Sequence, residues 1–379
     1  MEILPYSGLL FFTLIFVVIF ILHIFKNIFN QFISYKNLIF ILTISYIIIF
    51  LDNKITNAII GFLLYTYIVY WLSIKFNSKN LLFFTLIISI PMILFKLNIE
   101  PLYRVLGISY ITFRTIQAII DYKNYGKLSF VEFTSFILFP PTLLAGPIDR
   151  SYRFKKDLDS GYNNLTKENL ISGWDILILG ILFKFVFAEF INLFWLSKID
   201  ANSTILIDMI NSAYAYSTYL FFDFAGYSAM AVGIGKMLGI DVPINFNHPY
   251  LAQNPQDFWR RFHITLGSWL TDYFFKPIYK YLHGFKLLKG KRLLIQNISI
   301  ITTFLLMGMW NGLTWYYIFS GFLFGIYSAT HNTYVVYVKK GGYDYFTKFP
   351  NLVSINLKRL LMLNGAILAL YFFSGRVPI

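Results

Sequence analysis

The sequence predicts an all-α polytopic membrane protein, and two observations lead to this prediction. The 379 residues are 57% hydrophobic and 20% aromatic, while only 13% are charged. A soluble domain of this composition would have too little polar surface to cover itself. Apolar segments recur along the chain, and roughly eleven of them come close to the ~20 residues that cross a bilayer. We therefore expect one transmembrane domain over residues 1–379, with added re-entrant or interfacial helices and its core at about 100–335.

Charge and cysteine content narrow the function classes. The net charge of +14 would indicate nucleic acid as the partner of a soluble protein. Here Lys and Arg lie mainly between apolar segments, where they hold loops at the anionic cytoplasmic leaflet, so we expect no nucleic-acid partner. The chain has no cysteine, which excludes disulfides, thiol catalysis and thiolate metal sites. We expect no metal site and no bound cofactor.

In the first third of the sequence, the pattern predicts transmembrane helices without polar interruptions. Apolar segments lie near 8–25, 38–51, 56–74 and 80–97. MEILPYS lacks the basic region of a cleaved signal peptide, so we interpret the first segment as a retained helix. Lys26 and Lys36 flank the first link, and Lys75 and Lys79 flank the third. Because basic residues mark the cytoplasmic side, we expect both links to lie on the cytoplasmic side of the membrane and the N-terminus on the opposite side.

The next helix, from Tyr103 to Tyr122, carries polar residues. Arg104, Arg114, Gln117 and Asp121 interrupt apolar sequence there. Positions 114, 117 and 121 follow helical spacing, so their side chains share one face. Lipid would penalise that face, and we expect it to point into the protein or a wet cavity.

Irregular backbone is predicted after the apolar segment 130–144. Prolines and glycine in FPPTLLAGPIDR break the helix there. The polar interval 149–169 is predicted to be a cytoplasmic loop with short interfacial helices. Further spans are predicted near 172–197, 204–222, 293–310, 313–330 and 358–374.

The stretch 223–275 is a polar island in this apolar chain. Asp223 at membrane depth must be paired, hydrogen-bonded or protonated, and a structural contact with Arg or Tyr is favoured over catalysis. Pro243, Pro249 and Pro255 exclude a continuous helix, which predicts a re-entrant or interfacial loop. His248, beside a proline, is interpreted as structural.

The segment FWRRFHITLGSWLTDYFF contains the main catalytic candidate. Helical spacing would put Trp259, His263 and Leu266 on one packed face. An imidazole there can remove a proton from a hydroxyl near neutral pH. A hydrogen-bonded core histidine is an equally good interpretation of the pattern alone. His331, near the end of a span, is interpreted as interfacial.

A second special segment, MGMWNGLTWYY, places Asn311 between Trp310 and Gly312 in apolar sequence. Small residues at 308 and 312 predict close helix packing. An asparagine can hold a substrate or stabilise an oxyanion, but it cannot accept a proton. It can equally join two helices.

These segments together resemble the membrane-bound O-acyltransferase (MBOAT) family. DFAGYS, the run from NFNHPY through FWRRFHITLGSWLTDYFF, and GMWNGLTWYY occur in the order and near the spacing of the family signature. Within the family, GISYITFR and AGPIDR look most like the DltB-like members, which pass D-alanine toward teichoic acids in the plasma membrane of Gram-positive bacteria. Polysaccharide O-acetyltransferases share the FWRRFHI-type sequence and are the alternative.

The resemblance implies a ring of transmembrane helices around a central funnel or tunnel, and acyl transfer from a thioester to a hydroxyl or amine. For DltB-like members the donor is a D-alanyl group on the phosphopantetheine arm of an acidic, DltC-like carrier protein, and a short membrane peptide is a further partner. The residues that would line the tunnel are Arg114, Gln117, Asp121, Asp223, Tyr227 and Trp310. The residues that would dock the carrier are Arg153, Lys155, Lys156, Lys289, Lys291 and Arg292.

Two positions would carry the chemistry that this resemblance implies. His263 matches the histidine of the family's RWH-like segment, while the signature histidine of its GxWHG segment falls on Asn311. The preferred hypothesis is an acyltransferase in which His263 is the base and Asn311 positions the substrate or oxyanion, at a reduced rate. A catalytically inert carrier-docking or transport relative is the second hypothesis. A secondary transporter is the third, and the signature order argues against it.

Overall fold

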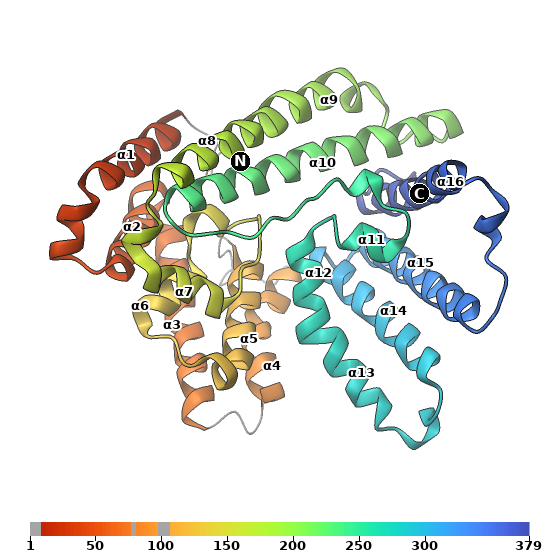
Figure 1. Ribbon diagram of the computed structural model, residues 1–379, viewed down its shortest axis with the longest axis horizontal. Coiled ribbons are helices and arrows are strands. Elements are labelled where there is room, and N and C mark those ends of the chain that lie inside the picture. The colour runs from red at the N-terminus through yellow and green to blue at the C-terminus, as the bar shows by residue number, and fades with distance from the viewer. Residues whose placement is uncertain (1–8, 77–80, 98–106, 379) are drawn as a thin grey trace. The chain divides into compact units, whose positions relative to one another are not determined.

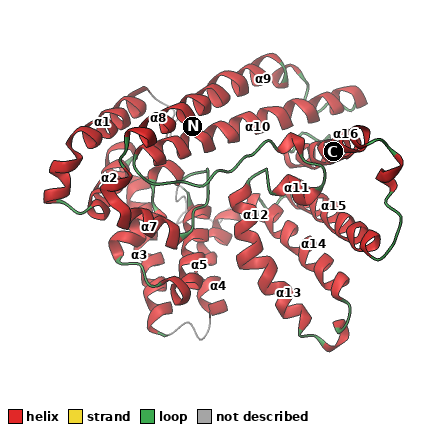
Figure 2. Ribbon diagram, in the orientation of Figure 1, coloured by secondary structure: helices red, strands yellow, loops and turns green. Residues whose placement is uncertain are grey.

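The computed structural model describes residues 9–76, 81–97 and 107–378, and this part of the chain consists of helices and loops (Figures 1 and 2). The all-α prediction is confirmed there. The described residues include one isolated antiparallel bridge, between Phe246 and Phe262. Lys79 and Arg104, named above, lie outside the described residues.

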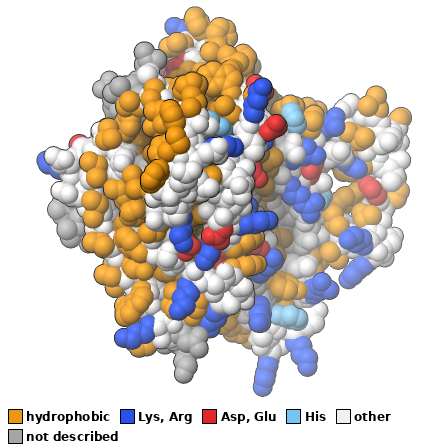
Figure 3. All heavy atoms as spheres, turned by 60° about the vertical axis from the view of Figure 1, so that its left-hand side comes forward, with side chains coloured by type: hydrophobic (Ala, Val, Ile, Leu, Met, Phe, Trp, Pro, Cys, Tyr) orange, Lys and Arg blue, Asp and Glu red, His pale blue; other side chains and the backbone are white. Residues whose placement is uncertain are grey.

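Several helices are suited to a bilayer. Five of those described are long and apolar enough to cross it: Phe12–Phe32, Asn53–Lys75, Lys167–Lys198, Arg292–Asn311 and Asn351–Phe373. Two shorter apolar helices cover Tyr35–Phe50 and Leu81–Lys96. Large hydrophobic side chains such as Leu82, which is 72% exposed, lie on the surface, and Figure 3 shows broad orange areas of this kind. Water would disfavour such patches, so the chain is a multi-pass membrane protein.

Contacts divide the chain into two compact units. Residues 1–181 and 227–243 form the first unit, and residues 182–226 and 244–379 form the second. The first contains α1 (Leu9–Phe32), α2 (Tyr35–Phe50), α3 (Asn53–Lys75), α4 (Leu81–Lys96), α5 (Ile108–Tyr125), α6 (Phe130–Ile137), α7 (Ser151–Ser160), α8 (Lys167–Ile181) and the C-terminal part of α10 (Leu206–Met237).

Local signals start several helices of the first unit. Asp52 caps α3, because its Oδ1 accepts the backbone N–H groups of Lys54 at 2.8 Å and Ile55 at 3.0 Å. Ser129 and Glu132 form a capping box at the start of α6. The predicted break after α6 is confirmed, since Pro140–Thr142 form only a 3-10 turn. The predicted short helix in the polar interval is α7.

Glycines let α8 approach the last turns of α10. A Cβ atom on Gly233 would lie 2.6 Å from the carbonyl oxygen of Gly173 and 2.8 Å from the backbone N of Leu177. Only a residue without a side chain permits this backbone contact. The pair therefore fixes α8 against the C-terminal part of α10.

The second unit contains the remaining elements. Apart from short 3-10 turns, they are a π-helix (Leu182–Ala188), α9 (Glu189–Phe194), the N-terminal part of α10, α11 (Pro255–Trp259), α12 (Ile264–Leu270), a second π-helix (Thr271–Phe275), α13 (Lys276–His283), α14 (Arg292–Asn311), α15 (Trp315–Lys339) and α16 (Asn351–Phe373). The residues between α10 and α11 are irregular, as the prolines predict.

The hairpin of α14 and α15 is closed by glycine contacts. A Cβ atom on Gly308 would lie 2.4 Å from the carbonyl oxygen of Tyr317, and one on Gly321 would lie 2.4 Å from that of Phe304. Close packing at position 308 is thus confirmed. Gly312 lies against the ring of Tyr317, which a Cβ would approach to 2.5 Å.

Some helices extend beyond the predicted spans. α10 is one helix from Leu206 to Met237, where the sequence predicts a span near 204–222 only. The polar residues from Asp223 onward are accommodated by side-chain pairing and by glycine packing, so the helix need not end there. α15 and α16 likewise continue to Lys339 and begin at Asn351.

Candidate active site

His263 lies in the second unit at a break between two short helices. α11 ends at Trp259 and α12 begins at Ile264, and His263 between them has φ 46°, in the left-handed region. The prediction that Trp259, His263 and Leu266 share one helical face is therefore wrong. A non-glycine residue in this conformation costs about 1–2 kcal/mol, and such positions concentrate at functional sites.

The break has a physical cause in the preceding irregular segment. Asn247 donates its N–H to the carbonyl of Arg261 at 2.9 Å, and Ile264 donates to the carbonyl of Asn245 at 3.0 Å. The side-chain oxygen of Asn245 also accepts the hydroxyl of Thr265 at 2.7 Å and its N–H at 3.2 Å. Backbone groups of residues 245–247 are thus paired with those of residues 261–264, and this pairing competes with a continuous helix.

The imidazole of His263 is enclosed by aromatic side chains. It is 7% exposed, and its ring centroid lies 4.6 Å from that of Phe224 and 6.3 Å from that of Trp310. Its Nε2 is buried and has no hydrogen-bond partner in the described part of the chain. Burial lowers the pKa of His263 below its usual value, so the ring is neutral at physiological pH. A neutral imidazole can accept a proton, and burial makes this one a weaker base than an exposed histidine.

Asn311 ends α14, the helix that also carries Trp310. Its Nδ2 donates to the carbonyl of Met307 at 2.9 Å, one turn back in the same helix. One amide N–H thus satisfies a carbonyl at the helix end. His263 and Asn311, the two predicted catalytic positions, both belong to the second unit. Trp310, the residue before Asn311, contacts the ring of His263.

Asp223 is paired, as expected for an acid at this depth, but its partner differs from the prediction. Lys184 in the first π-helix donates to its carboxylate, where the sequence predicts Arg or Tyr. The two residues are far apart in sequence, and the π-helical register that aims Lys184 is not visible in residue spacing. The pair braces the second unit.

The predicted polar face of α5 is buried inside the first unit. Arg114 is 1% exposed, Gln117 is 0% and Asp121 is 8%. Arg114 donates to the carbonyls of Phe136 at 3.1 Å and Ile137 at 3.0 Å, and to the carbonyl of Thr142 at 2.7 Å and its hydroxyl at 2.5 Å. Arg114 thus replaces the hydrogen bonds that the broken helix lost at FPPT.

Gln117 and Tyr227 also have structural contacts in the first unit. Gln117 donates its Nε2 to the carbonyl of Asp149 at 2.6 Å. Gly146, with φ 95°, passes over the Tyr227 ring, which a Cβ atom there would approach to 3.3 Å. The assignment of Arg114, Gln117, Asp121, Asp223, Tyr227 and Trp310 to a substrate tunnel stays a prediction.

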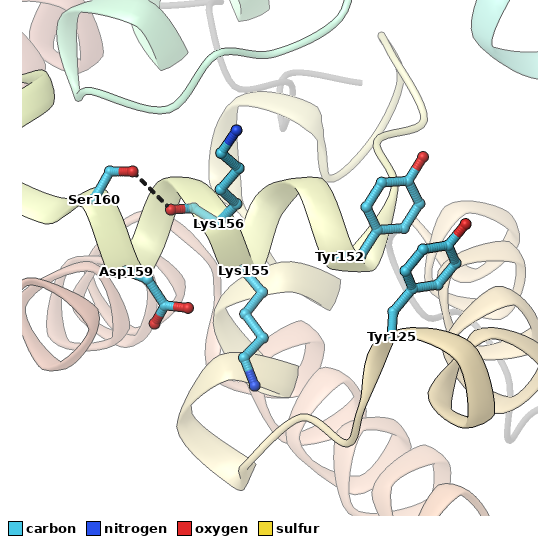
Figure 4. Close-up of a pocket in the computed structure, with 6 residues that line it drawn as sticks. All are labelled: Tyr125, Tyr152, Lys155, Lys156, Asp159 and Ser160. Carbon is cyan, nitrogen blue, oxygen red and sulfur yellow. Dashed lines mark hydrogen bonds between the residues drawn. The ribbon is translucent and has the colours of Figure 1, made fainter.

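Three of the six predicted docking residues lie on α7 in the first unit. Arg153 donates to Asp149 and, at 3.4 Å, to Asp157. Lys155 lies 3.7 Å from Glu132 and donates to the carbonyl of Lys127 at 3.2 Å. Figure 4 shows Lys155 and Lys156 pointing in opposite directions from the helix.

An open pocket of about 550 Å³ lies beside α7 (Figure 4). Tyr125 and Tyr152 stack there with ring centroids 4.1 Å apart, and Lys156 is exposed at its edge. Arg153 is largely neutralised by carboxylates, so Lys156 is the better placed cation for an acidic partner. In the second unit, Lys289, Lys291 and Arg292 are all exposed. Docking at any of these residues stays a prediction.

Sequence reasoning missed two contributors to the site. Asn245 holds the start of α12, and Lys184 pairs with Asp223. A local signal existed for Asn245, because it lies in an Asn-rich irregular segment, but its partner could not be found from spacing. Among the described residues, no group of three or more His, Asp or Glu side chains could hold a metal ion.

Comparisons with known proteins identify the family of this chain. The membrane-bound O-acyltransferase family, MBOAT, matches residues 121–374. The chain is 35% identical over 280 residues to the teichoic acid D-alanyltransferase of Bacillus subtilis, covering 72% of this chain and 69% of that protein. It is 32% identical over 287 residues to the teichoic acid D-alanyltransferase of Lacticaseibacillus rhamnosus, covering 71% and 69%.

A second group of relatives bears a different name. The chain is 38% identical over 209 residues to the peptidoglycan O-acetyltransferase of Helicobacter pylori, covering 54% of this chain and 38% of that protein. Both groups are acyltransferases by name, and the family match covers the segments that carry His263 and Asn311. The chain therefore belongs to the membrane-bound O-acyltransferase family and is an acyltransferase.

Proposed function

We propose that this protein transfers D-alanyl groups from a carrier-protein thioester toward teichoic acid at the bacterial plasma membrane. Two relatives named teichoic acid D-alanyltransferase, each matched over 69% of its own length, support the choice of acyl group and acceptor. The donor reaches the enzyme as a thioester on the phosphopantetheine arm of an acidic carrier. About 11 spans and the family's ring around a funnel belong to the same proposal.

The observation that carries the mechanism is the state of His263. Its neutral imidazole has a buried Nε2 without a partner in the described part of the chain, and backbone pairing holds it in place. In the proposed step, Nε2 accepts the proton of the acceptor hydroxyl while that oxygen attacks the thioester carbonyl carbon. The C–S bond then breaks, and the imidazolium returns the proton to the leaving sulfur. A thioester is an activated donor, so orientation and one proton transfer suffice.

Asn311 takes the place of the signature histidine and has a different role in this proposal. An amide cannot accept a proton, but an amide N–H can hold the carbonyl oxygen as negative charge develops. Its first N–H donates to Met307, which fixes the side chain at the end of α14. We expect this arrangement to work more slowly than one with two histidines.

The exposed positive charges of the protein and its family resemblance suggest two binding partners. An acidic, DltC-like carrier would meet exposed cations such as Lys156 in the first unit, or Lys289, Lys291 and Arg292 in the second. A short membrane peptide is a further proposed partner on the acceptor side.

A second function has support of its own. The 38% identity to a peptidoglycan O-acetyltransferase is the highest among the relatives described above, although it covers little of that protein. The alternative is therefore acetyl transfer to a cell-surface polysaccharide. The same base would serve, because the acceptor is again a hydroxyl.

The deciding experiment is complementation of a gene deletion in the source bacterium. Cells would receive this sequence, Asn311→His, His263→Ala or His248→Ala, and base-labile D-alanine and acetate on the wall would be measured. We expect D-alanine to return with this sequence and with His248→Ala, to rise further with Asn311→His, and to stay absent with His263→Ala. Rescue by Asn311→His alone would show that the natural form is an inert docking relative. A change in acetate instead would establish the alternative.

A further inference from the structure

A large groove in the second unit is not used by the proposed mechanism. It encloses about 920 Å³ and lies between the C-terminal half of α15 and the N-terminal half of α16. Gln253, Asn254 and Pro255, at the start of α11, close one side. This volume lies at the upper end of the range for sites that hold organic ligands.

The body of the groove is apolar. Its walls include Ile326, Val335, Val338, Leu361 and Met362. At Gly365 an added Cβ atom would lie 3.5 Å from the Tyr327 ring, at ordinary contact distance, so the glycine leaves space that a side chain would fill. Such a surface suits a hydrocarbon chain.

One end of the groove is cationic. Lys339 and Lys358 line it together with a single carboxylate, Asp344. That carboxylate accepts the hydroxyl of Tyr334 at 2.6 Å and the N–H of Phe346 at 2.9 Å. The two lysines therefore outnumber an acid that is already hydrogen-bonded, and this end favours a negatively charged group.

A histidine on α15 also lines this region. His331 lines the groove, and its Nδ1 is buried with no hydrogen-bond partner in the described part of the chain. A buried nitrogen without a partner is costly, and rotation of the ring toward the groove would let a ligand oxygen satisfy it. A plain hydrocarbon would not.

The direction of the helices places the cationic end at the cytoplasmic leaflet. α14 starts at Arg292, after the basic link KLLKGKR, and α15 returns antiparallel to end at Lys339. Lys340, Lys358 and Arg359 follow at the same end. Basic residues mark the cytoplasmic side, where anionic lipids create a negative surface.

We propose that this groove binds one anionic glycerophospholipid of the inner leaflet. Its acyl chain lies along the apolar wall, its phosphate lies between Lys339 and Lys358, and a glycerol or ester oxygen pairs with His331. The bound lipid would contact Asn254, which caps α11 by accepting the N–H of Asp257 at 2.9 Å. This site is separate from the acyl-transfer chemistry and does not depend on it.

The test uses the full chain in mild detergent with added phosphatidylglycerol or phosphatidylcholine, and native mass spectrometry counts the retained lipid. We expect one retained phosphatidylglycerol and about tenfold weaker retention after Lys339→Gln with Lys358→Gln, since each lysine contributes to binding an anionic surface. Gly365→Leu should also remove the lipid by filling the groove. The matched controls are Lys340→Gln, an exposed cation outside the lining, and Gly61→Leu, which has nothing within 4 Å.

Four results would overturn the proposal, and the first three concern which lipid is retained, by which variants and against which competitor. They are equal retention of both lipids, loss of lipid in the control variants as in the groove variants, and displacement of the lipid by free pantetheine, which would assign the groove to the donor arm. The fourth is that glycerol phosphate at millimolar concentration displaces the lipid while Gly365→Leu retains it. The site would then bind only the phosphate headgroup, and the apolar wall would have no role. Thermal unfolding of each variant separates lost lipid binding from lost folding.

Discussion

Arg114 in the first unit and His263 in the second are both buried polar side chains in an apolar chain, but their surroundings differ. Arg114 donates to four oxygens of the segment Phe136–Thr142. His263 is held by its backbone in a left-handed conformation, and its Nε2 has no partner among the described residues. The guanidinium of Arg114 thus satisfies four buried acceptors, although its own Nε has no partner in the described part of the chain, whereas Nε2 of His263 satisfies none.

The difference separates architecture from chemistry. Removing the guanidinium of Arg114 would leave several buried carbonyls without donors, so its loss should appear as a loss of stability. Nε2 of His263 has no partner in the described part of the chain, so loss of the imidazole should appear mainly in acyl transfer. The four predictions below test this separation.

The largest effect is expected for Arg114→Met. Its buried acceptors lose all their side-chain donors, which should cost about 3–5 kcal/mol of folding free energy. Arg114→Lys should recover only part, because an ammonium cannot reproduce the forked geometry of the guanidinium. Thermal unfolding in detergent measures this, and Arg292→Met, at an exposed arginine, serves as the control. Equal melting temperatures for Arg114→Met and Arg292→Met would refute the structural role.

The second effect concerns His263 and its matched control, His248. Both have left-handed backbone, with φ 46° and 47°, but Nδ1 of His248 is within 2.8 Å of the Tyr250 hydroxyl. Glycine accepts this conformation, so His248→Gly, at an exposed position, should change stability by no more than about 1 kcal/mol. His263→Gly also leaves a cavity among aromatic side chains and should cost about 2–4 kcal/mol. Transfer should fall by about 10²-fold or more in His263→Gly alone.

Purified protein with a D-alanyl thioester donor provides the readout for this pair. An active His263→Gly enzyme would assign the base elsewhere. Equal losses in both variants would indicate that the irregular loop, and not the imidazole, had been damaged.

The same contrast shows what could be predicted from sequence. Prolines after α6 and α10 act locally, and both irregular segments were predicted correctly. The spacing of Arg114, Gln117 and Asp121 predicted a shared buried face, and all three side chains are buried in the first unit. These outcomes depend on the residues themselves and their near neighbours.

Pairing between distant segments could not be predicted. The break before α12 arises because Asn245 and Asn247 bond to Ile264 and Arg261, so helical spacing was misleading at His263. The Lys184–Asp223 pair likewise joins the first π-helix to α10. Sequence alone shows that such groups need partners, but the fold selects which partners they find.

The third effect is steric. It tests whether the close contact between α14 and α15 tolerates an added methyl group. In Gly308→Ala the new methyl group would meet the Tyr317 carbonyl at 2.4 Å, so the helices must separate at a cost of about 1–3 kcal/mol. Gly61→Ala, in the middle of α3 with nothing within 4 Å, should instead gain about 0.5–1 kcal/mol from helix propensity. Unfolding measurements on both variants check the signs, and a stable Gly308→Ala would mean that α14 and α15 are not in such close contact.

The smallest effect is a pH dependence in the first unit, where polar groups are paired. Burial would raise the pKa of Glu132, but hydrogen bonds from Ser129 and the nearby Lys155 and Lys36 outweigh it and hold the pKa below its ordinary value of 4.5. A folded-state pKa below the unfolded value adds stability that is present above about pH 4.5 and is lost as pH falls through the folded pKa.

Melting temperatures between pH 3 and pH 7 should therefore fall less steeply on acidification in Glu132→Gln than in the parent, by an amount worth about 1 kcal/mol or less. Ser129→Ala keeps the lysines but removes the cap, so its slope should lie between the two. Parallel curves for all three proteins would show that Glu132 has no pH-linked role. A reduced slope in Glu132→Gln with unchanged acyl transfer would place this carboxylate with Arg114, among the groups that support the fold and leave the reaction to His263.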